Sequence, residues 1–322
     1  EYIKTRKPIV NVMCTDNPVF ENLSLDSSFT HTRAFVKIQD GCSQFCSYCI
    51  IPYVRGPIRS RKLEDILDEV IRLSLNGYSE VVLTGIHLTD YGRDLRENID
   101  LTDVIHNIAA IDGIKRIRLG SLEPTFLTDE VVNSISTAEK LCRHFHMSLQ
   151  SGSASVLKRM NRAYTPEVYF KIIDKIRSFF SDVAISTDII TGFPGETDEE
   201  FRETCEFIKK VNFARIHVFP YSIRAGTAAA LMDNQVPGLV KMKRSELLIN
   251  IGNEMEDNFL RCHIGTTVSV LIEEPSDIKG YMEGYTDNYM RVAVPCGSEN
   301  KGKIINVKVC EVVKKCCISC EI

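Results

Sequence analysis

From residue 34 onward, short runs rich in β-branched residues alternate with amphipathic stretches, and this alternation restricts the fold more than any other feature. The rhythm is typical of repeated strand–helix units in an α/β fold, where helices cover parallel strands. In residues 63–76, apolar side chains recur every three or four positions and share one helical face. Six units up to residue 222 predict a partial (β/α)6 barrel. The predicted strands span 34–38, 80–85, 116–120, 144–150, 183–190 and 215–222, and the predicted helices span 63–76, 101–110, 166–179 and 198–210.

The pattern changes after a long polar helix predicted over residues 240–261. Four short strand-like runs follow, with Asp287-Asn288 as a turn between two of them. A chain of 322 residues can bury one large core and still form a small module. We therefore expect a small all-β barrel after the α/β barrel. Its predicted strands are 266–274, 279–286, 289–294 and 303–309.

The amino-acid composition restricts the cellular compartment and the binding partners that we expect for the chain. No apolar run is long enough to cross a bilayer, and the first residues do not form the apolar core of a signal peptide, so we expect a cytoplasmic protein without membrane contact. Twelve cysteines, including one tight cluster, favour metal ligation in a reducing compartment over disulfides. The net charge of −4 means that any RNA contact must come from local basic patches.

Cys42, Cys46 and Cys49 follow the first predicted strand with the spacing Cys-x-x-x-Cys-x-x-Cys. Three thiolates from one loop can hold a 4Fe–4S cluster and leave one iron open. An open iron suits S-adenosylmethionine (SAM), which chelates through its amino and carboxylate groups; one electron would then release a 5′-deoxyadenosyl radical. A zinc knuckle is the alternative, but it needs a fourth ligand, and the nearest histidine, His31, precedes the strand.

Other unusual segments also follow predicted strands, at the carboxyl ends where barrels of this kind carry their sites. They are GCSQFCSYC, TGIH, SLEP, QSGS, TGFPGE and FPYS. Residues 34–61 resemble the opening of the radical SAM domain in the methylthiotransferase family, and LTGIH, SLEP, QSGSASVLKRMNRAYT, TDIITGFPGET and VFPYS follow in the family's order. The resemblance extends to about residue 309, and the last module resembles a TRAM domain, a small β-barrel found on RNA-modifying enzymes.

The resemblance implies roles for residues around SAM. Tyr48 would lie beside the nucleoside, or pack the loop. Gly85 would let the backbone approach the methionyl amino group closely. Glu123 and Gln150 would bind polar groups of SAM or the reacting base, or hold loops in place.

Two further pocket residues follow from the same resemblance. Arg162 would pair with the SAM carboxylate in a two-pronged geometry, or lie on the surface. Asp188 would face the barrel mouth and bind the nucleoside. A basic run after the cysteines forms either a phosphate-binding patch or a solvated charge run, and three tyrosines of the last module are candidates for stacking on bases. These residues are Arg55, Arg59, Arg61 and Lys62, and Tyr281, Tyr285 and Tyr289.

Two segments resemble the branch of this family that acts on threonylcarbamoyladenosine beside the tRNA anticodon. They are LTGIH with a following YG, and GYTDNYMRV. That branch implies methylthiolation of carbon 2 of the modified adenine, with tRNA, SAM and a reducing electron donor as partners. Alternatives are methylthiolation of isopentenyladenosine or of a ribosomal protein side chain. An alternative of another class is a non-catalytic RNA-binding protein with a structural cluster.

The expected domain boundaries follow from these patterns. We expect a linker or remnant of an N-terminal domain over 1–33, a radical SAM domain over 34–262, a TRAM-like domain over 263–315, and a disordered tail without a role for its thiols over 316–322. In the family, an N-terminal domain holds a second 4Fe–4S cluster. Only Cys14 precedes the radical SAM motif here, so we expect a truncated chain that cleaves SAM without completing sulfur insertion.

Overall fold

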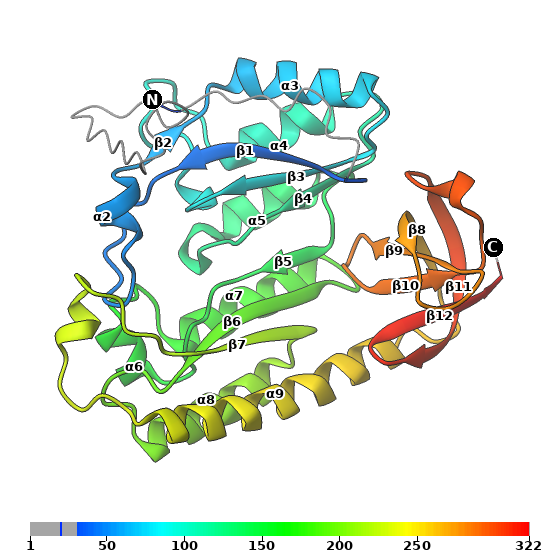
Figure 1. The fold of residues 1–322 in the computed structure, drawn as a ribbon. Coiled ribbons are helices and arrows are strands. Elements are labelled where there is room, and N and C mark those ends of the chain that lie inside the picture. Colours follow the sequence, from blue (N-terminus) through cyan, green and yellow to red (C-terminus); the bar gives the residue numbers. More distant parts are fainter. Residues whose placement is uncertain (1–19, 21–30, 322) are drawn as a thin grey trace, which may run out of the picture.

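Six parallel strands form the larger body of the protein, in the spatial order of their sequence (Figure 1). The computed structural model describes Phe20 and residues 31–321, so Cys14 and nearly all of the segment expected to be a linker lie outside the described residues. Isolated parallel bridges join β4 to β5 and link the two sheets, which confirms the predicted partial barrel. The strands are β1 (Ala34–Asp40), β3 (Glu80–Gly85), β4 (Arg116–Leu119), β5 (His144–His146), β6 (Ala184–Thr191) and β7 (Arg215–Pro220), and the two-residue β2 (Arg59–Ser60) pairs antiparallel with β1.

Helices cover the outside of this barrel, and polar residues define where several of them begin. Asp100 and Thr197 each form a capping box, with Asp103 and Glu200 respectively. Three short helices escaped the sequence analysis because none of them spans three full turns, too few for a clear period; they are α2, α5 and α6 below. The helices are α2 (Ile51–Arg55), α3 (Leu63–Leu75), α4 (Leu101–Ala109), α5 (Asp129–Ser136), α6 (Ala154–Arg159), α7 (Pro166–Phe179), α8 (Asp198–Val211) and α9 (Gly238–Arg261), with 3-10 turns η1 (Leu88–Asp90), η2 (Pro124–Phe126), η3 (Ala228–Leu231) and η4 (Ser298–Asn300).

The long helix α9 runs along β7 and leads from the large barrel to the small one (Figure 1). Its buried residues, among them Leu248 and Met255, pack into the core of the large barrel. Leu260, near its end, belongs to the core of the small barrel instead. Among the described residues, no helix is both long and apolar enough to span a membrane.

The small body is a closed barrel of five strands, one more than the sequence pattern predicted. The prediction of a disordered end is wrong for β12, which pairs with both β10 and β11 and buries Cys317 and Ile318. A barrel must close its edges, and this segment supplies the closing strand. Cys310 and Cys320 form a disulfide across β11 and β12, contrary to the expectation of free thiols. The strands are β8 (Thr267–Pro275), β9 (Met282–Thr286), β10 (Arg291–Val294), β11 (Ile304–Val313) and β12 (Cys316–Glu321).

The small barrel contacts the amino ends of the large barrel's strands, at the end opposite the cysteine loop (Figure 1). Arg116 donates hydrogen bonds to the carbonyl oxygens of Tyr285 and Ser269 at 3.0 and 2.6 Å. Arg118 donates to the carbonyl oxygen of Thr286 at 3.0 Å and forms an ion pair with Glu80 at 2.7 Å. Buried arginines therefore join the two barrels.

Candidate active site

The three loop cysteines line one cavity of about 150 Å³ at the carboxyl ends of the strands. The loop that carries them runs from β1 to α2, and the backbone N–H of Cys42 donates to the carbonyl oxygen of Gly56 at 3.0 Å. Gly41 begins the loop with φ +72°, and a Cβ there would lie 1.9 Å from the carbonyl oxygen of Pro57. Only glycine tolerates both conditions, so this residue fixes where the loop leaves the strand.

Gln39, which the sequence analysis did not identify, holds the base of this loop. Its side chain is fully buried and donates to the carbonyl oxygens of Asp40 and Gly41, both at 2.8 Å. Its Oε1 accepts a hydrogen bond from the backbone N–H of His87 at 2.7 Å, so one amide ties the cysteine loop to the end of β3. The sequence signal was a polar, uncharged residue near the end of the first strand, directly before the cysteine loop.

Arg162 and Glu123 meet at the cavity wall. The Arg162 guanidinium lies 3.3 Å from Cys46 Sγ and 2.6 Å from a Glu123 carboxylate oxygen, and both side chains are buried. The sequence analysis proposed SAM contacts for both residues, and the structure brings them together in one ion pair. A guanidinium beside a cysteine sulfur stabilises the thiolate that a metal needs as a ligand.

His87 adds a second positive charge to the cavity wall. Its Nδ1 lies 3.0 Å from Asp90 and its Nε2 lies 3.8 Å from Glu123. Burial opposes the charged imidazole, but the interactions with Asp90 and Glu123 outweigh burial and raise the pKa of His87 to about 9. Nε2 is buried without a hydrogen-bond partner among the described residues. Nε2 thus has an ion-pair partner but no hydrogen bond, and a buried donor of this kind beside a cavity fits a polar ligand group.

Burial makes two of the cysteine thiols harder to ionise in the absence of a metal. Burial raises the pKa of Cys42 and of Cys49. Burial also raises the pKa of Tyr48, which lines the cavity and packs against a small apolar cluster that includes Met160 and Phe193. Three thiols on one cavity, with Arg162 to compensate negative charge, fit a cluster with three cysteine ligands.

Three predicted pocket residues do not line this cavity. A Cβ on Gly85 would lie 2.9 Å from the Gln39 side chain, so the space that glycine leaves is filled by protein. Gln150 adopts φ +68° and bonds through its backbone to β6. The Asp188 carboxylate lies 3.2 Å from His146 Nε2. Their predicted contacts with SAM or nucleoside stay predictions.

The basic run after the cysteines is partly engaged in ion pairs within the protein, and its last member, Lys62, is exposed. Arg61 is 4% exposed and forms an ion pair with Glu69. Arg59 lies 3.4 Å from Asp40, and the more exposed Arg55 lies 4.0 Å from it. The local sequence showed the charges, but their carboxylate partners come from other elements.

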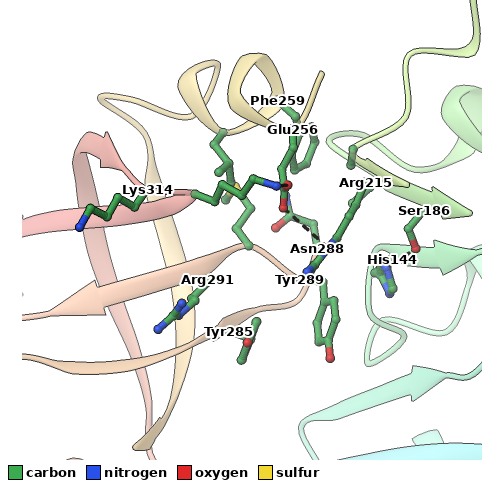
Figure 2. A pocket seen from close by; sticks show the side chains of 15 residues that line it. His144, Ser186, Arg215, Glu256, Phe259, Tyr285, Asn288, Tyr289, Arg291 and Lys314 are labelled. Atoms are coloured by element: carbon green, nitrogen blue, oxygen red, sulfur yellow. Dashed lines mark hydrogen bonds and ion pairs between the residues drawn. The ribbon is translucent and has the colours of Figure 1, made fainter. Parts of the chain in front are cut away.

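A second cavity of about 220 Å³ lies at the junction of the two barrels (Figure 2). Tyr285 and Tyr289 stack there with ring centroids 4.9 Å apart, and the guanidinium of Arg118 lies 4.6 Å from the Tyr289 ring centroid. His144 contacts the Tyr289 ring from the large barrel at 4.8 Å. Tyr281 packs against a separate small cluster around Ile318. The tyrosines predicted to stack on bases are thus engaged within the protein.

Comparison with known families gives two matches along the chain. The radical SAM superfamily model matches residues 36–208, more than half of the chain, and the TRAM domain model matches residues 261–316. Among solved structures, the radical SAM methyltransferase TsrM from Kitasatospora setae has a TM-score of 0.52 at 16% identity and covers 62% of this chain and 38% of its own. Coproporphyrinogen III oxidase from Escherichia coli has a TM-score of 0.51 at 18% identity, over 69% of this chain and 52% of its own. These structures show the fold.

Two relatives match nearly the whole sequence. A threonylcarbamoyladenosine tRNA methylthiotransferase of Bacillus subtilis (strain 168) is 38% identical over 314 residues, which cover 96% of this chain and 69% of the relative. A tRNA-2-methylthio-N(6)-dimethylallyladenosine synthase of Caldicellulosiruptor saccharolyticus is 40% identical over 309 residues, 96% of this chain and 65% of the relative. The chain thus spans about two thirds of each relative's length. It belongs to the radical SAM tRNA methylthiotransferase family.

Proposed function

We propose that the chain carries the SAM-cleaving part of an enzyme that methylthiolates carbon 2 of N6-threonylcarbamoyladenosine next to the tRNA anticodon. The observation that carries this proposal is the cavity at the strand ends, where three cysteines face Arg162 and His87. The family implies a 4Fe–4S cluster and SAM. We assign Cys42, Cys46 and Cys49 as the three ligands of that cluster.

The chain's own residues would prepare the site. The cluster, when bound, supplies the electron that cleaves SAM. Arg162 compensates negative charge beside Cys46, and the charged His87 offers a donor to a carboxylate. We propose that the chain cleaves SAM and that the small barrel binds tRNA.

Two observations support the threonylcarbamoyl substrate. Its substituent carries a carboxylate, and the cavity wall carries the cations Arg162 and His87 rather than a wholly apolar surface. The first relative acts, by its name, on threonylcarbamoyladenosine. The second candidate is dimethylallyladenosine, favoured by the 40% identity to the second relative.

Mass spectrometry of tRNA nucleosides from cells without the corresponding gene separates these candidates. We expect the methylthio group to be lost from threonylcarbamoyladenosine alone. Loss from dimethylallyladenosine would support the second candidate. No change in any tRNA nucleoside would overturn both and point to modification of a protein side chain. Reductant-dependent release of 5′-deoxyadenosine by the purified chain would exclude a merely structural cluster.

A further inference from the structure

Three side chains in the large barrel lie close enough to hold one metal ion. His146 ends β5, while Asp188 and His217 are paired neighbours in β6 and β7. Ligand atoms from the three residues lie within 4.8 Å of one another. His146 Nε2 is 3.2 Å from Asp188 Oδ2. Two donors bound to one tetrahedral zinc are about 3.3 Å apart, so this pair needs little movement to bind the ion.

The three side chains face the barrel interior. Side chains alternate along a strand, and the neighbours Met147 and Ile189 are buried in the core beneath the helices. His146, Asp188 and His217 are all partly exposed, so an ion could reach them from the interior. The position requires no rearrangement of the strands.

A hydrogen bond already orients the His146 ring. Ser186 Oγ lies 3.0 Å from His146 Nδ1, which leaves Nε2 directed at Asp188. Metal-bound histidines in proteins are held by a partner of this kind on the other ring nitrogen. Ser186 also lies 2.9 Å from Nε2 of His144, and Figure 2 shows both residues on the large-barrel side of the junction cavity.

His217 supplies a ligand that nothing else engages. Within residues 31–321, neither of its ring nitrogens has a hydrogen bond or ion pair. Two histidines and one carboxylate are the ligand set of many zinc and non-haem iron(II) sites that keep coordination positions open. A hydrogen-bonded His146–Asp188 pair alone would not explain why His217 lies beside these two residues.

We propose that His146, Asp188 and His217 bind one divalent transition-metal ion whose open positions face the barrel interior. The site borders the cysteine cavity, because Ser148, two residues after His146 and on the same face, lines that cavity. This ion is separate from the iron–sulfur cluster and does not depend on the proposed tRNA substrate.

Zinc alone is the probe for the test. The cluster-loaded chain would be equilibrated with buffered Zn²⁺, its zinc content measured by mass spectrometry, and its ligands by X-ray absorption at the zinc edge. We expect one zinc per chain, bound by nitrogen and oxygen. His217→Ala should weaken binding by at least about 100-fold, and Ser186→Ala by about 10–100-fold. His106→Ala, which changes a histidine bonded to Ser134 on another helix pair, should bind zinc as the parent does.

Several results would overturn the proposal. They are no bound zinc, zinc bound only by sulfur, or equal affinity in the parent, His217→Ala and Asp188→Asn. The absorption spectrum of the parent decides the question even if a variant fails to fold. A chain with Cys42, Cys46 and Cys49 changed to alanine should give the same zinc site, so the test stands if the cluster does not load.

Discussion

At the carboxyl ends of the barrel strands, charged side chains surround a cavity, whereas at the amino ends they join two domains. Arg162 and His87 represent the first end: Arg162 contacts a cysteine sulfur, and His87 has a buried ring nitrogen that forms no hydrogen bond and lies 3.8 Å from Glu123. Arg118 represents the second end, where it bonds to Glu80 and to the carbonyl oxygens of Thr286 and Asp287.

This difference shows how charged residues that serve a functional site can be told apart from charged residues that hold the fold together. Arg162 and Arg118 are both buried arginines with carboxylate partners, so burial and ion pairing alone do not distinguish the two ends. The distinguishing feature is what the remaining donors face. At one end they face a cavity with thiols, and at the other they face backbone carbonyls of the second domain.

The largest expected effect is at the cysteine end. Cys46→Ala should reduce iron in the reconstituted chain to background and abolish 5′-deoxyadenosine release, because two thiolates cannot hold the cluster. Iron analysis and chromatography of the product measure both. Cys262→Ser is the matched control, since Cys262 is an exposed free thiol. Full iron content in Cys46→Ala would show that Cys46 is not a cluster ligand, and would contradict the assignment of the cluster to the carboxyl ends of the strands.

At the opposite end, Arg118→Ala should destabilise the protein without changing the chemistry. Removing one partner of a buried ion pair lowers the free energy of unfolding by about 3–5 kcal/mol. Urea denaturation measures the loss, and SAM cleavage per folded molecule should stay at the parent level. Arg202→Ala, which breaks an exposed pair with Glu199, should change stability by less than about 1 kcal/mol. Loss of SAM cleavage in folded Arg118→Ala would contradict the assignment of a purely structural role to the charges at the amino ends of the strands.

The raised pKa of His87 predicts a pH dependence of stability. Because the folded pKa, about 9, exceeds the ordinary 6.5, this stabilisation is fully present below pH 6.5 and is lost as pH rises to 9. The shift corresponds to about 3 kcal/mol. Denaturation of the parent and of His87→Gln at several pH values measures it. Equal pH dependence in both proteins would show that His87 is not charged in the folded state.

The smallest effect separates the two possible roles of Tyr289. Tyr289→Phe removes the hydroxyl that accepts a hydrogen bond from Arg33 at 3.2 Å but keeps the stacked ring. We expect a loss of about 1 kcal/mol in the free energy of unfolding and unchanged tRNA affinity. A weaker tRNA complex with unchanged stability would instead assign Tyr289 to RNA.

The sequence predicted features that local patterns encode. The six barrel strands and the cysteine loop follow from period, composition and spacing within short segments. The β9–β10 turn at Asp287-Asn288 was also predicted from local residue types.

Features that depend on distant partners were missed. β12 is a strand because β10 and β11 pair with it, although its cysteine-rich sequence gives no clear alternation. Arg61 is buried because Glu69, nearly two helical turns into α3, neutralises it. The charge of His87 depends first on Asp90, three residues along the chain, but also on Glu123, which follows a different strand. The Tyr-Gly pair that follows LTGIH also has a role in holding the fold. The Tyr91 side chain is buried, and its hydroxyl donates a hydrogen bond to the carbonyl oxygen of Arg61.

Electron paramagnetic resonance of the reduced, cluster-loaded chain with and without SAM tests the central claim most directly. If three cysteines hold the cluster and one iron stays open beside Arg162 and His87, SAM should change the spectrum and 5′-deoxyadenosine should follow. A cluster whose spectrum is the same with and without SAM, with no 5′-deoxyadenosine released, would contradict the assignment of chemistry to this end of the barrel.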